Sequence, residues 1–230
     1  MPPQLALLHT SPLHVETFGR LLAAAAPQLP VQHVVDETLL ADAQRLGADE
    51  PTLVRRVQQA MAAAAAAQGA SLVVCTCSTI GAAAERMPTG GRFTAARIDR
   101  AMADQAVTRG PRILLVAALQ STLVPTQQLI EQSAVRLGRP VQIERLWVPG
   151  AWAFFESGDR TAYVDSVVQA VRGVVGRAAG ADGRLARQPA DVVVLAQASM
   201  AAAAEALQDL AVPVLSSPSL GVQAIVAHFG

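Results

Sequence analysis

Short apolar runs alternate along this chain with longer segments in which apolar residues recur every three or four positions. Short apolar runs are typical of β-strands, and the longer spacing is typical of amphipathic helices. Strands are predicted at Leu5–Leu8, Val31–Val35 and Ser71–Thr76, and helices at Pro12–Ala25, at Pro51–Ala67 and from near Ser78 onward. Alternating strands and helices favour an α/β fold with a mainly parallel sheet covered by helices on both faces.

The pattern occurs twice along the chain. Shifted by 110 positions, Ser11-Pro12-Leu13 falls on Ser121-Thr122-Leu123. An insertion around Gly180 to Pro189 raises the offset to 120, and Ala82-Ala83-Ala84-Glu85 then meets Ala202-Ala203-Ala204-Glu205. Because the elements repeat in the same order, we predict an internal duplication that forms two similar lobes.

Charge and hydropathy restrict the kinds of molecule that this protein is expected to bind. The 230 residues carry 18 basic and 18 acidic side chains, so no basic footprint for nucleic acid is expected. No apolar run reaches the roughly 20 residues that span a bilayer, and the N-terminus lacks the pattern of a signal peptide. We therefore expect a cytoplasmic protein with a small-molecule ligand, no nucleic-acid partner and no membrane contact. Self-association is left open.

Hydroxyl groups follow the first predicted strand of each half. In open parallel sheets, ligands bind where strands end and helices begin. Thr10 and Ser11 occupy this place in the first half, and Ser121 and Thr122 occupy it in the second. Hydroxyls and backbone N–H groups at a helix start suit an anion. Ser11 and Ser121 equally suit the role of helix caps, and one residue can serve both purposes.

A thiol follows the third predicted strand, in Cys77-Ser78-Thr79. The dipole of a helix favours the thiolate form of a cysteine at its start, which makes Cys77 a candidate base or nucleophile. A small apolar residue in a tight turn is the alternative interpretation. Cys75 belongs to the predicted strand and is assigned to the core, and both cysteines are expected to be free thiols. Two cysteines and four scattered histidines give no zinc-ligand spacing, so no metal is expected.

Other polar residues lie at predicted strand ends. Gln197 stands in the second half where Cys77 stands in the first. An amide is neither an acid nor a base, but it can orient a carboxylate. The pair Asp36-Glu37 is interpreted as a helix cap with a solvated neighbour rather than as a site for a substrate ammonium. His9 is a candidate partner for Cys77, whereas the other three histidines indicate no constellation.

Two further segments receive structural roles. Arg97-Ile98-Asp99 marks the expected crossing between the halves, with Asp99 capping the helix from Arg100 onward. Four aromatic residues in a stretch flanked by glycine and proline are assigned to packing, with a pocket wall as the alternative: Trp147, Trp152, Phe154 and Phe155.

Two short motifs resemble those of a known family. Cys77-Ser78-Thr79 resembles the Cys-Asn-Thr/Ser element that follows a strand in the aspartate/glutamate/hydantoin racemase superfamily. Ala196-Gln197-Ala198-Ser199-Met200-Ala201 resembles the second element of that superfamily, which is Gly-Cys-Ala-Gly-Met-Ala in hydantoin racemases. The similarity spans nearly the whole chain and includes the duplication.

The resemblance implies two flavodoxin-like lobes related by a pseudo-twofold axis, with an active-site cleft between them and no cofactor. It implies an N-terminal lobe of residues 1–99 and 212–230 that carries Cys77, and a C-terminal lobe of residues 100–211 that carries Gln197. The last strand, near Val214, would return to the first lobe. Loop hydroxyls, amides and backbone groups would bind the substrate, namely those of Thr10, Ser11, Ser78, Thr79, Ser121, Thr122, Gln197, Ala198 and Ser199.

The second motif departs from the family pattern. In such racemases two cysteines flank the α-carbon; one takes the proton and the other returns it on the opposite face. Gln197 stands where the second thiol is expected. The leading hypothesis is therefore a racemase-like, cofactor-independent enzyme that acts at the carbon next to the carboxylate of a small acid or amino acid, with Cys77 as base or nucleophile. A single-cysteine, decarboxylase-like lyase and a non-catalytic small-acid-binding protein stay open as alternatives.

Overall fold

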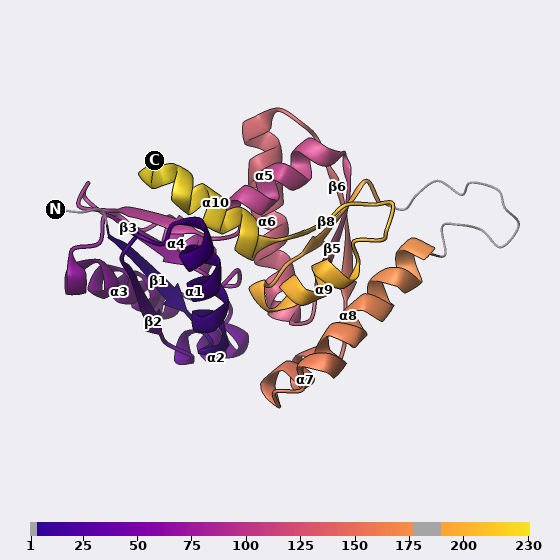
Figure 1. The fold of residues 1–230 in the computed structure, drawn as a ribbon, viewed down its shortest axis with the longest axis horizontal. Helices are drawn as coiled ribbons and strands as arrows, with labels where there is room; N and C mark the ends of the chain where they lie inside the picture. The colour runs from indigo at the N-terminus through magenta and orange to yellow at the C-terminus, as the bar shows by residue number, and fades with distance from the viewer. Residues whose placement is uncertain (1–3, 177–189) are drawn as a thin grey trace, which may run out of the picture. The chain divides into compact units, whose positions relative to one another are not determined.

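The computed structural model describes residues 4–176 and 190–230, which form two compact α/β units (Figure 1). The first unit comprises Met1–Ala101 and Pro218–Gly230, and the second comprises Met102–Ser217. Each unit contains one four-stranded sheet in which all pairings are parallel. The α/β class with two similar lobes is thereby confirmed. The insertion expected around Gly180 to Pro189 lies outside the described residues.

The first sheet has the strand order β2-β1-β3-β4. Its strands are β1 (Leu5–His9), β2 (Val31–Val35), β3 (Leu72–Cys75) and β4 (Thr94–Arg97). The helices of this unit are α1 (Leu13–Ala25), α2 (Thr38–Leu46), α3 (Pro51–Gln68), α4 (Gly81–Glu85) and α10 (Ser217–Phe229). The three predicted strands and the first two predicted helices are confirmed to within one residue at each end.

Local signals in the sequence explain where α3 begins and ends. The Glu50 carboxylate accepts a hydrogen bond from the backbone N–H of Leu53 at 2.8 Å, and Pro51 occupies the first turn. Gly69 ends the helix with a φ of 68°, a left-handed conformation that glycine adopts without strain. Every residue of β1 and β3 is buried, as expected for central strands that helices cover on both faces.

One apolar cluster of the first unit lies between the sheet and three of its helices. Ala6 and Leu8 of β1 pack in one apolar cluster with Val73 and Cys75 of β3 and with residues of α2, α3 and α4. Side chains alternate between the two faces of a strand, so the same cluster brings every second residue of β1 and β3 to one side. The carboxyl ends of these two strands are thereby held on a rigid base.

The second sheet has the order β6-β5-β7-β8. Its strands are β5 (Arg112–Ala117), β6 (Gln142–Trp147), β7 (Val192–Leu195) and β8 (Val214–Ser216). Its helices are α6 (Leu123–Leu137), α7 (Ala151–Glu156), α8 (Arg160–Val175) and α9 (Ala201–Ala206), with single 3-10 turns at Gln120–Thr122 and Ala198–Met200. Helix α5 (Arg100–Arg109) runs from the first unit into the second.

Equivalent backbone hydrogen bonds confirm the duplication. The Thr76 N–H donates to the Leu8 carbonyl at 2.9 Å, just beyond β3. The Ala196 N–H donates to the Val116 carbonyl, also at 2.9 Å, just beyond β7. Because Cys77 and Gln197 each follow the donating residue, they occupy equivalent positions in the two units, as the repeat predicts.

The expectation that the last strand returns to the first lobe is wrong. β8 pairs in parallel with β7 of the second sheet, with Val193 opposite Val214. The fourth place in the first sheet is already taken by β4, which pairs with β3. The chain therefore returns to the first unit only after Ser217, through α10.

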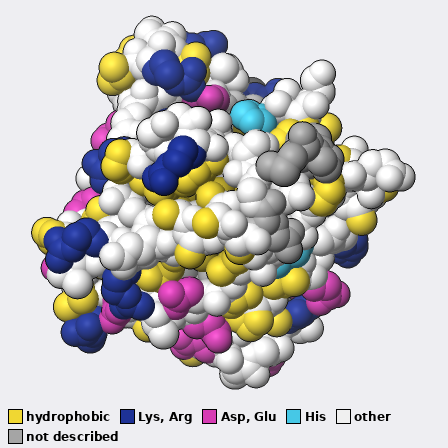
Figure 2. All heavy atoms as spheres, turned by 90° about the vertical axis from the view of Figure 1, so that its left-hand side faces the viewer, with side chains coloured by type: hydrophobic (Ala, Val, Ile, Leu, Met, Phe, Trp, Pro, Cys, Tyr) yellow, Lys and Arg dark blue, Asp and Glu magenta, His cyan; other side chains and the backbone are white. Residues whose placement is uncertain are grey.

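The surface carries both signs of charge. Figure 2 shows one face of the molecule, on which basic and acidic side chains are interspersed with apolar ones. Among residues 4–176 and 190–230, no helix is long and apolar enough to cross a membrane. The absence of a nucleic-acid partner stays a prediction.

Candidate functional site

Two loops of the first unit carry the predicted site residues of that half. The parallel pairing of β1 with β3 brings the carboxyl ends of the two strands side by side. Thr10-Ser11 follows β1 and Cys77-Ser78-Thr79 follows β3, and all five side chains are buried. The Thr76 hydroxyl donates to the Leu8 carbonyl at 3.2 Å and ties the two strand ends together. These residues therefore share one edge of the sheet, where ligands bind in open parallel folds.

Cys77 does not lie at the start of a helix. Residues 78–80 form a turn, and α4 begins at Gly81 and spans only five residues. A helix dipole acts within the first turn, so the expected assistance to the thiolate is absent from this loop. The first residue of this turn is Ser78, and its carbonyl group accepts a hydrogen bond from Arg97.

The two thiols differ in their surroundings. Cys75 is fully buried in β3, and burial raises the pKa of its thiol well above the usual range. Its Sγ contacts the Cys77 carbonyl oxygen at 3.6 Å. Cys77 is 7% exposed and belongs to the apolar cluster of the first unit. Both cysteines are free, as predicted, and Cys77 is the more accessible of the two.

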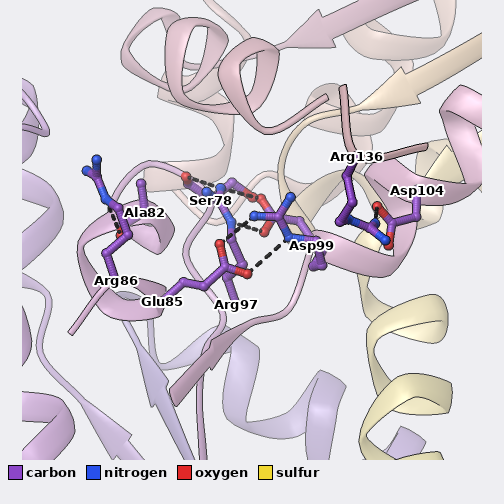
Figure 3. Close-up of polar contacts among 9 residues, drawn as sticks. Ser78, Ala82, Glu85, Arg86, Arg97, Asp99, Asp104 and Arg136 are labelled. Atoms are coloured by element: carbon purple, nitrogen blue, oxygen red, sulfur yellow. Dashed lines mark hydrogen bonds and ion pairs between the residues drawn. The ribbon is translucent and has the colours of Figure 1, made fainter. Parts of the chain in front are cut away.

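Ser78 combines a fixed backbone with an unused hydroxyl. Its carbonyl oxygen accepts a hydrogen bond from Nη2 of Arg97 at 3.1 Å (Figure 3). Its Oγ is buried and has no hydrogen-bond partner among the residues that the structure describes. Burying a hydroxyl without a partner is unfavourable, so the Ser78 hydroxyl is available to a ligand or a water. Ser11 differs, because its Oγ accepts a long hydrogen bond of 3.4 Å from the Leu13 N–H at the start of α1.

Three histidines gather beside this edge, contrary to expectation. The Nδ1 of His9 lies 2.8 Å from the Thr76 hydroxyl oxygen, and its Nε2 lies 2.9 Å from Nδ1 of His33. The His9 and His14 rings meet edge to face with centroids 6.4 Å apart. His9 and His33 lie on neighbouring strands, two residues apart in register, and hence on one face of the sheet. The alternation of side chains along β1 and β2 was the signal that could have revealed this cluster.

The histidine cluster is uncharged near neutral pH. Burial, together with the nearby His14 and His33, lowers the pKa of His9 from 6.5 to about 3. Burial lowers the pKa of His14 to about 4 and also lowers that of His33. Within the described parts of the chain, no three His, Cys, Asp or Glu side chains are arranged to hold a metal ion.

Gln197 closes the corresponding edge of the second unit. Its Oε1 accepts hydrogen bonds from the backbone N–H groups of Ala118 at 2.8 Å and Leu119 at 3.0 Å. Its Nε2 donates to no atom of the residues that the structure describes. Gln197 is 7% exposed, so its amide N–H group is the part that a ligand can engage.

The serines of the second unit are not equivalent to one another. The Ser199 Oγ lies 2.8 Å from the Tyr163 hydroxyl, and burial raises the pKa of Tyr163. The Ser121 Oγ is buried without a hydrogen-bond partner in the described part of the chain, and no side chain caps α6. The cap interpretation is therefore wrong for Ser121. Thr122 is buried beside it, and Ala198 is buried in the turn after Gln197.

The remaining predictions concern acidic and aromatic residues. The N-cap position of α2 is held by Glu37, which makes no side-chain cap hydrogen bond, while the Asp36 Oδ1 accepts from the N–H of Thr38 at 3.0 Å and from its hydroxyl at 2.5 Å. Trp152 stacks on Phe155 with ring centroids 4.7 Å apart, and both pack on the core of the second unit. The structure thus confirms packing for these two rings. Trp147 and Phe154 are exposed.

Arg97 and Asp99 form a buried ion pair that sequence reasoning missed. The Nε and Nη2 of Arg97 donate to the two carboxylate oxygens of Asp99 at 2.6 and 2.9 Å (Figure 3). The side chains are 1% and 0% exposed. Although burial opposes its charge, the Asp99 carboxylate raises the pKa of Arg97. The role predicted for Asp99 was that of a helix cap, and its carboxylate instead binds a guanidinium two residues away.

The similarity of this chain to known proteins is a similarity of structure. No protein-family model and no curated protein matches the sequence. A glutamate racemase from Bacillus anthracis superposes with a TM-score of 0.66 at 14% identity, covering 99% of this chain and 83% of that one. An allantoin racemase from Klebsiella pneumoniae gives 0.62 at 21% identity over 98% and 86% of the two chains. An aspartate racemase from Picrophilus torridus gives 0.67 at 11% identity over 99% and 94%. The chain has the fold of these racemases.

The racemase fold confirms the resemblance at the level of architecture. Within this chain, Cys77 and Gln197 stand at equivalent strand ends of the two units. At identities of 11 to 21%, the fold by itself does not define an activity, which has to be argued from the side chains. The cleft expected between the lobes stays a prediction.

Proposed function

We propose that this protein is a cofactor-independent, racemase-type enzyme that moves a proton at the carbon next to the carboxylate of a small acid or amino acid. Cys77 is the proposed base. The observation that carries the proposal lies at the end of β3 of a racemase fold. There the more accessible thiol lies beside the buried hydroxyl of Ser78, which has no hydrogen-bond partner among the described residues. A thiol for proton transfer and a donor for developing negative charge are the two groups that this chemistry requires.

The proposed step is a proton transfer that needs no other reagent. The Cys77 thiolate takes the α-proton and becomes a thiol, and the electron pair of the C–H bond moves into the adjacent carboxylate. The Ser78 hydroxyl, with Thr10, Ser11 and Thr79, is proposed to bind that carboxylate. The thiol then returns a proton to the carbon, which regenerates the thiolate.

The second unit is proposed to contribute contacts and no base. An amide does not titrate, so Gln197 takes up no proton from the carbon. The proposed contacts are the Nε2 of Gln197 and the loop groups of Ser121, Thr122, Ala198 and Ser199. With a single thiol, removal and return of the proton take place on one face of the carbon. Inversion would require an acid from another group.

The test is hydrogen–deuterium exchange in deuterated water, followed by NMR over a panel of small carboxylic acids, amino acids and hydantoins. Wild type, Cys77→Ala and Cys75→Ala are compared. Cys75→Ala removes a thiol two residues away and is the matched control. We expect loss of the α-proton signal with wild type and with folded Cys75→Ala, and no exchange above background with Cys77→Ala. Equal exchange in wild type and Cys77→Ala would refute the role of Cys77.

A non-catalytic small-acid-binding protein is the second candidate. Gln197 favours this candidate, because its amide oxygen accepts backbone hydrogen bonds at the strand end and the side chain cannot act as a base. A binding protein would show no exchange on the panel, while a bound acid would still protect Cys77 from alkylation by iodoacetamide. Exchange that depends on Cys77 would exclude it.

A further inference from the structure

We propose that Arg97 is a positioning residue for the loop that carries Cys77 and Ser78, and that its buried pairing with Asp99 fixes the guanidinium for this task. The inference rests on the proposed function of Cys77 and adds to it a residue that does not touch the substrate. The segment that carries Cys77 and Ser78 has little regular structure and is followed by a helix of only five residues. Arg97 is the residue proposed to hold it.

The guanidinium of Arg97 joins two segments. Its Nε and Nη2 hold the two oxygens of Asp99, and Nη2 also donates to the carbonyl oxygen of Ser78 at 3.1 Å (Figure 3). Two parallel hydrogen bonds to one carboxylate fix the plane of a guanidinium. The direction of the third bond is thereby set, and with it the position of the peptide group that follows Cys77.

Gly81 admits the guanidinium at the other end of the turn. A Cβ at position 81 would lie 2.8 Å from Nε and 2.9 Å from Cζ of Arg97. The guanidinium is a planar group held by Asp99, so it cannot give way as the tip of a free side chain would. Any residue with a side chain at position 81 would push Arg97 and the turn apart. Arg97 therefore contacts both ends of the stretch from Ser78 to Gly81.

A second ion pair anchors the far end of α4. The carboxylate of Glu85 accepts from Nε and Nη2 of Arg100 at 3.0 and 2.5 Å. A single helical turn has little stability of its own, because nucleation of a helix is unfavourable. Two arginines of the segment 97–100 thus hold α4 and its preceding turn, Arg97 through Ser78 and Arg100 through Glu85.

The segment 97–100 is held in place by contacts on two sides. The N–H of Ile98 donates to the Cys75 carbonyl at 3.0 Å, which extends the pairing of β3 with β4. Helix α10 approaches so closely that a Cβ on Gly221 would lie 2.4 Å from the Ile98 carbonyl oxygen. Arg97 and Asp99 flank Ile98. The Arg97–Asp99 ion pair therefore lies in a segment of the first unit that is packed on both sides.

Stability alone does not account for the buried pair. Replacing a buried ion pair with apolar side chains of similar size is often neutral or stabilising, because the desolvation of both charges is avoided. Removing one partner is strongly destabilising, since it leaves a buried charge uncompensated. A double apolar replacement therefore separates the two roles: it preserves packing and removes the donor to Ser78.

The test uses the full chain with Arg97→Met/Asp99→Leu and with Gly81→Ala. Alkylation of Cys77 by iodoacetamide is followed by mass spectrometry, which locates the label, beside thermal unfolding of each variant. Releasing the turn should expose Cys77 and speed its alkylation about tenfold, because local opening becomes easier when buried hydrogen bonds are lost. Exchange of the α-proton should fall about 100-fold in kcat with KM little changed, as expected for a displaced catalytic group.

Arg86→Met is the matched control. Arg86 also lies just after α4 and donates to the Ala82 carbonyl, but its side chain is 62% exposed. Its loss should leave both rates at the wild-type level. Alkylation of Cys77 at the wild-type rate in folded Arg97→Met/Asp99→Leu and in Gly81→Ala would overturn the proposal. So would faster alkylation with unchanged exchange.

The two proposals fail in different ways. If wild type exchanges no α-proton, the proposed function fails, and the alkylation rates still decide whether Arg97 holds the loop. If the double variant does not fold, Gly81→Ala decides alone, because it keeps both charges and favours the helical conformation.

Discussion

The side-chain oxygen of Gln197 lies 2.8 Å from the backbone nitrogen of Ala118 and accepts its hydrogen bond. The equivalent position in the first unit holds Cys77, a thiol that makes no such bridge to β1. The same place in the two units therefore serves two purposes. Gln197 closes the end of a strand, whereas Cys77 leaves a thiol that is 7% exposed. This difference is the physical basis for expecting chemistry on one face only.

Gln197→Ala should lower the free energy of unfolding by about 2 kcal/mol, because two backbone N–H groups, of which that of Ala118 is buried, lose their acceptor. Gln197→Glu keeps an acceptor in the same place and should be closer to wild type. Urea unfolding followed by circular dichroism measures both. The exposed Gln128→Ala serves as control and should be neutral. A Gln197→Ala protein as stable as wild type would show that water replaces the bridge without loss.

Gly221→Ala should destabilise the first unit by about 1–3 kcal/mol, the range for overpacking, because the new Cβ would meet the Ile98 carbonyl oxygen at 2.4 Å. Gly19→Ala, also inside a helix of this unit, is the matched control. The nearest atom to its new Cβ is Nε2 of His33 at 4.0 Å, an ordinary contact. That substitution should stabilise the protein by about 0.5–1 kcal/mol through helix propensity. Equal effects of the two changes on the thermal midpoint would contradict the close approach of α10.

Acid should destabilise the first unit before any carboxylate titrates strongly. The pKa of His9 is about 3 and that of His14 about 4 in the folded protein, against 6.5 when unfolded. The unfolded chain therefore binds protons below pH 6.5 that the folded chain does not, so stability is full above that pH and falls as the pH drops. Between pH 7 and pH 5 the expected loss is about 2 kcal/mol for each of these two histidines.

His14→Phe should remove about half of this acid sensitivity, while His228→Gln, on the exposed end of α10, should leave it unchanged. Unfolding by urea at a series of pH values provides the measurement. A free energy of unfolding that is flat from pH 7 to pH 5 would mean that the histidines are not held neutral in the folded state.

Much of the fold could be predicted because the information lies within short windows. β3 and the first four residues of β1 are apolar, and Glu50, Pro51 and Gly69 mark the ends of α3 by their own chemistry. The equivalence of Cys77 and Gln197 followed from the repeat. These features depend on neighbours in the sequence, or on a second copy of the same pattern.

The features that were missed depend on residues far apart. Arg97, which ends a strand, donates to the Ser78 carbonyl, 19 positions earlier in the chain and just before α4. An alanine-rich run predicts a helix, but it does not predict a hydrogen bond to a side chain from a distant part of the sequence. Nothing local in Val214–Ser216 indicates which sheet that strand joins, because the choice depends on β4 already occupying the edge of the first sheet.

The most direct test of the central claim is enantiomer-resolved exchange. A substrate that loses its α-proton in deuterated water is incubated as each pure enantiomer with wild type and Cys77→Ala, and deuterium content and handedness are followed together by NMR and chiral chromatography. We predict that wild type places deuterium at the α-carbon of one enantiomer with its configuration retained, and that Cys77→Ala abolishes the exchange. Exchange that persists without Cys77, or inversion as fast as exchange from the first turnover, would contradict a single-thiol mechanism.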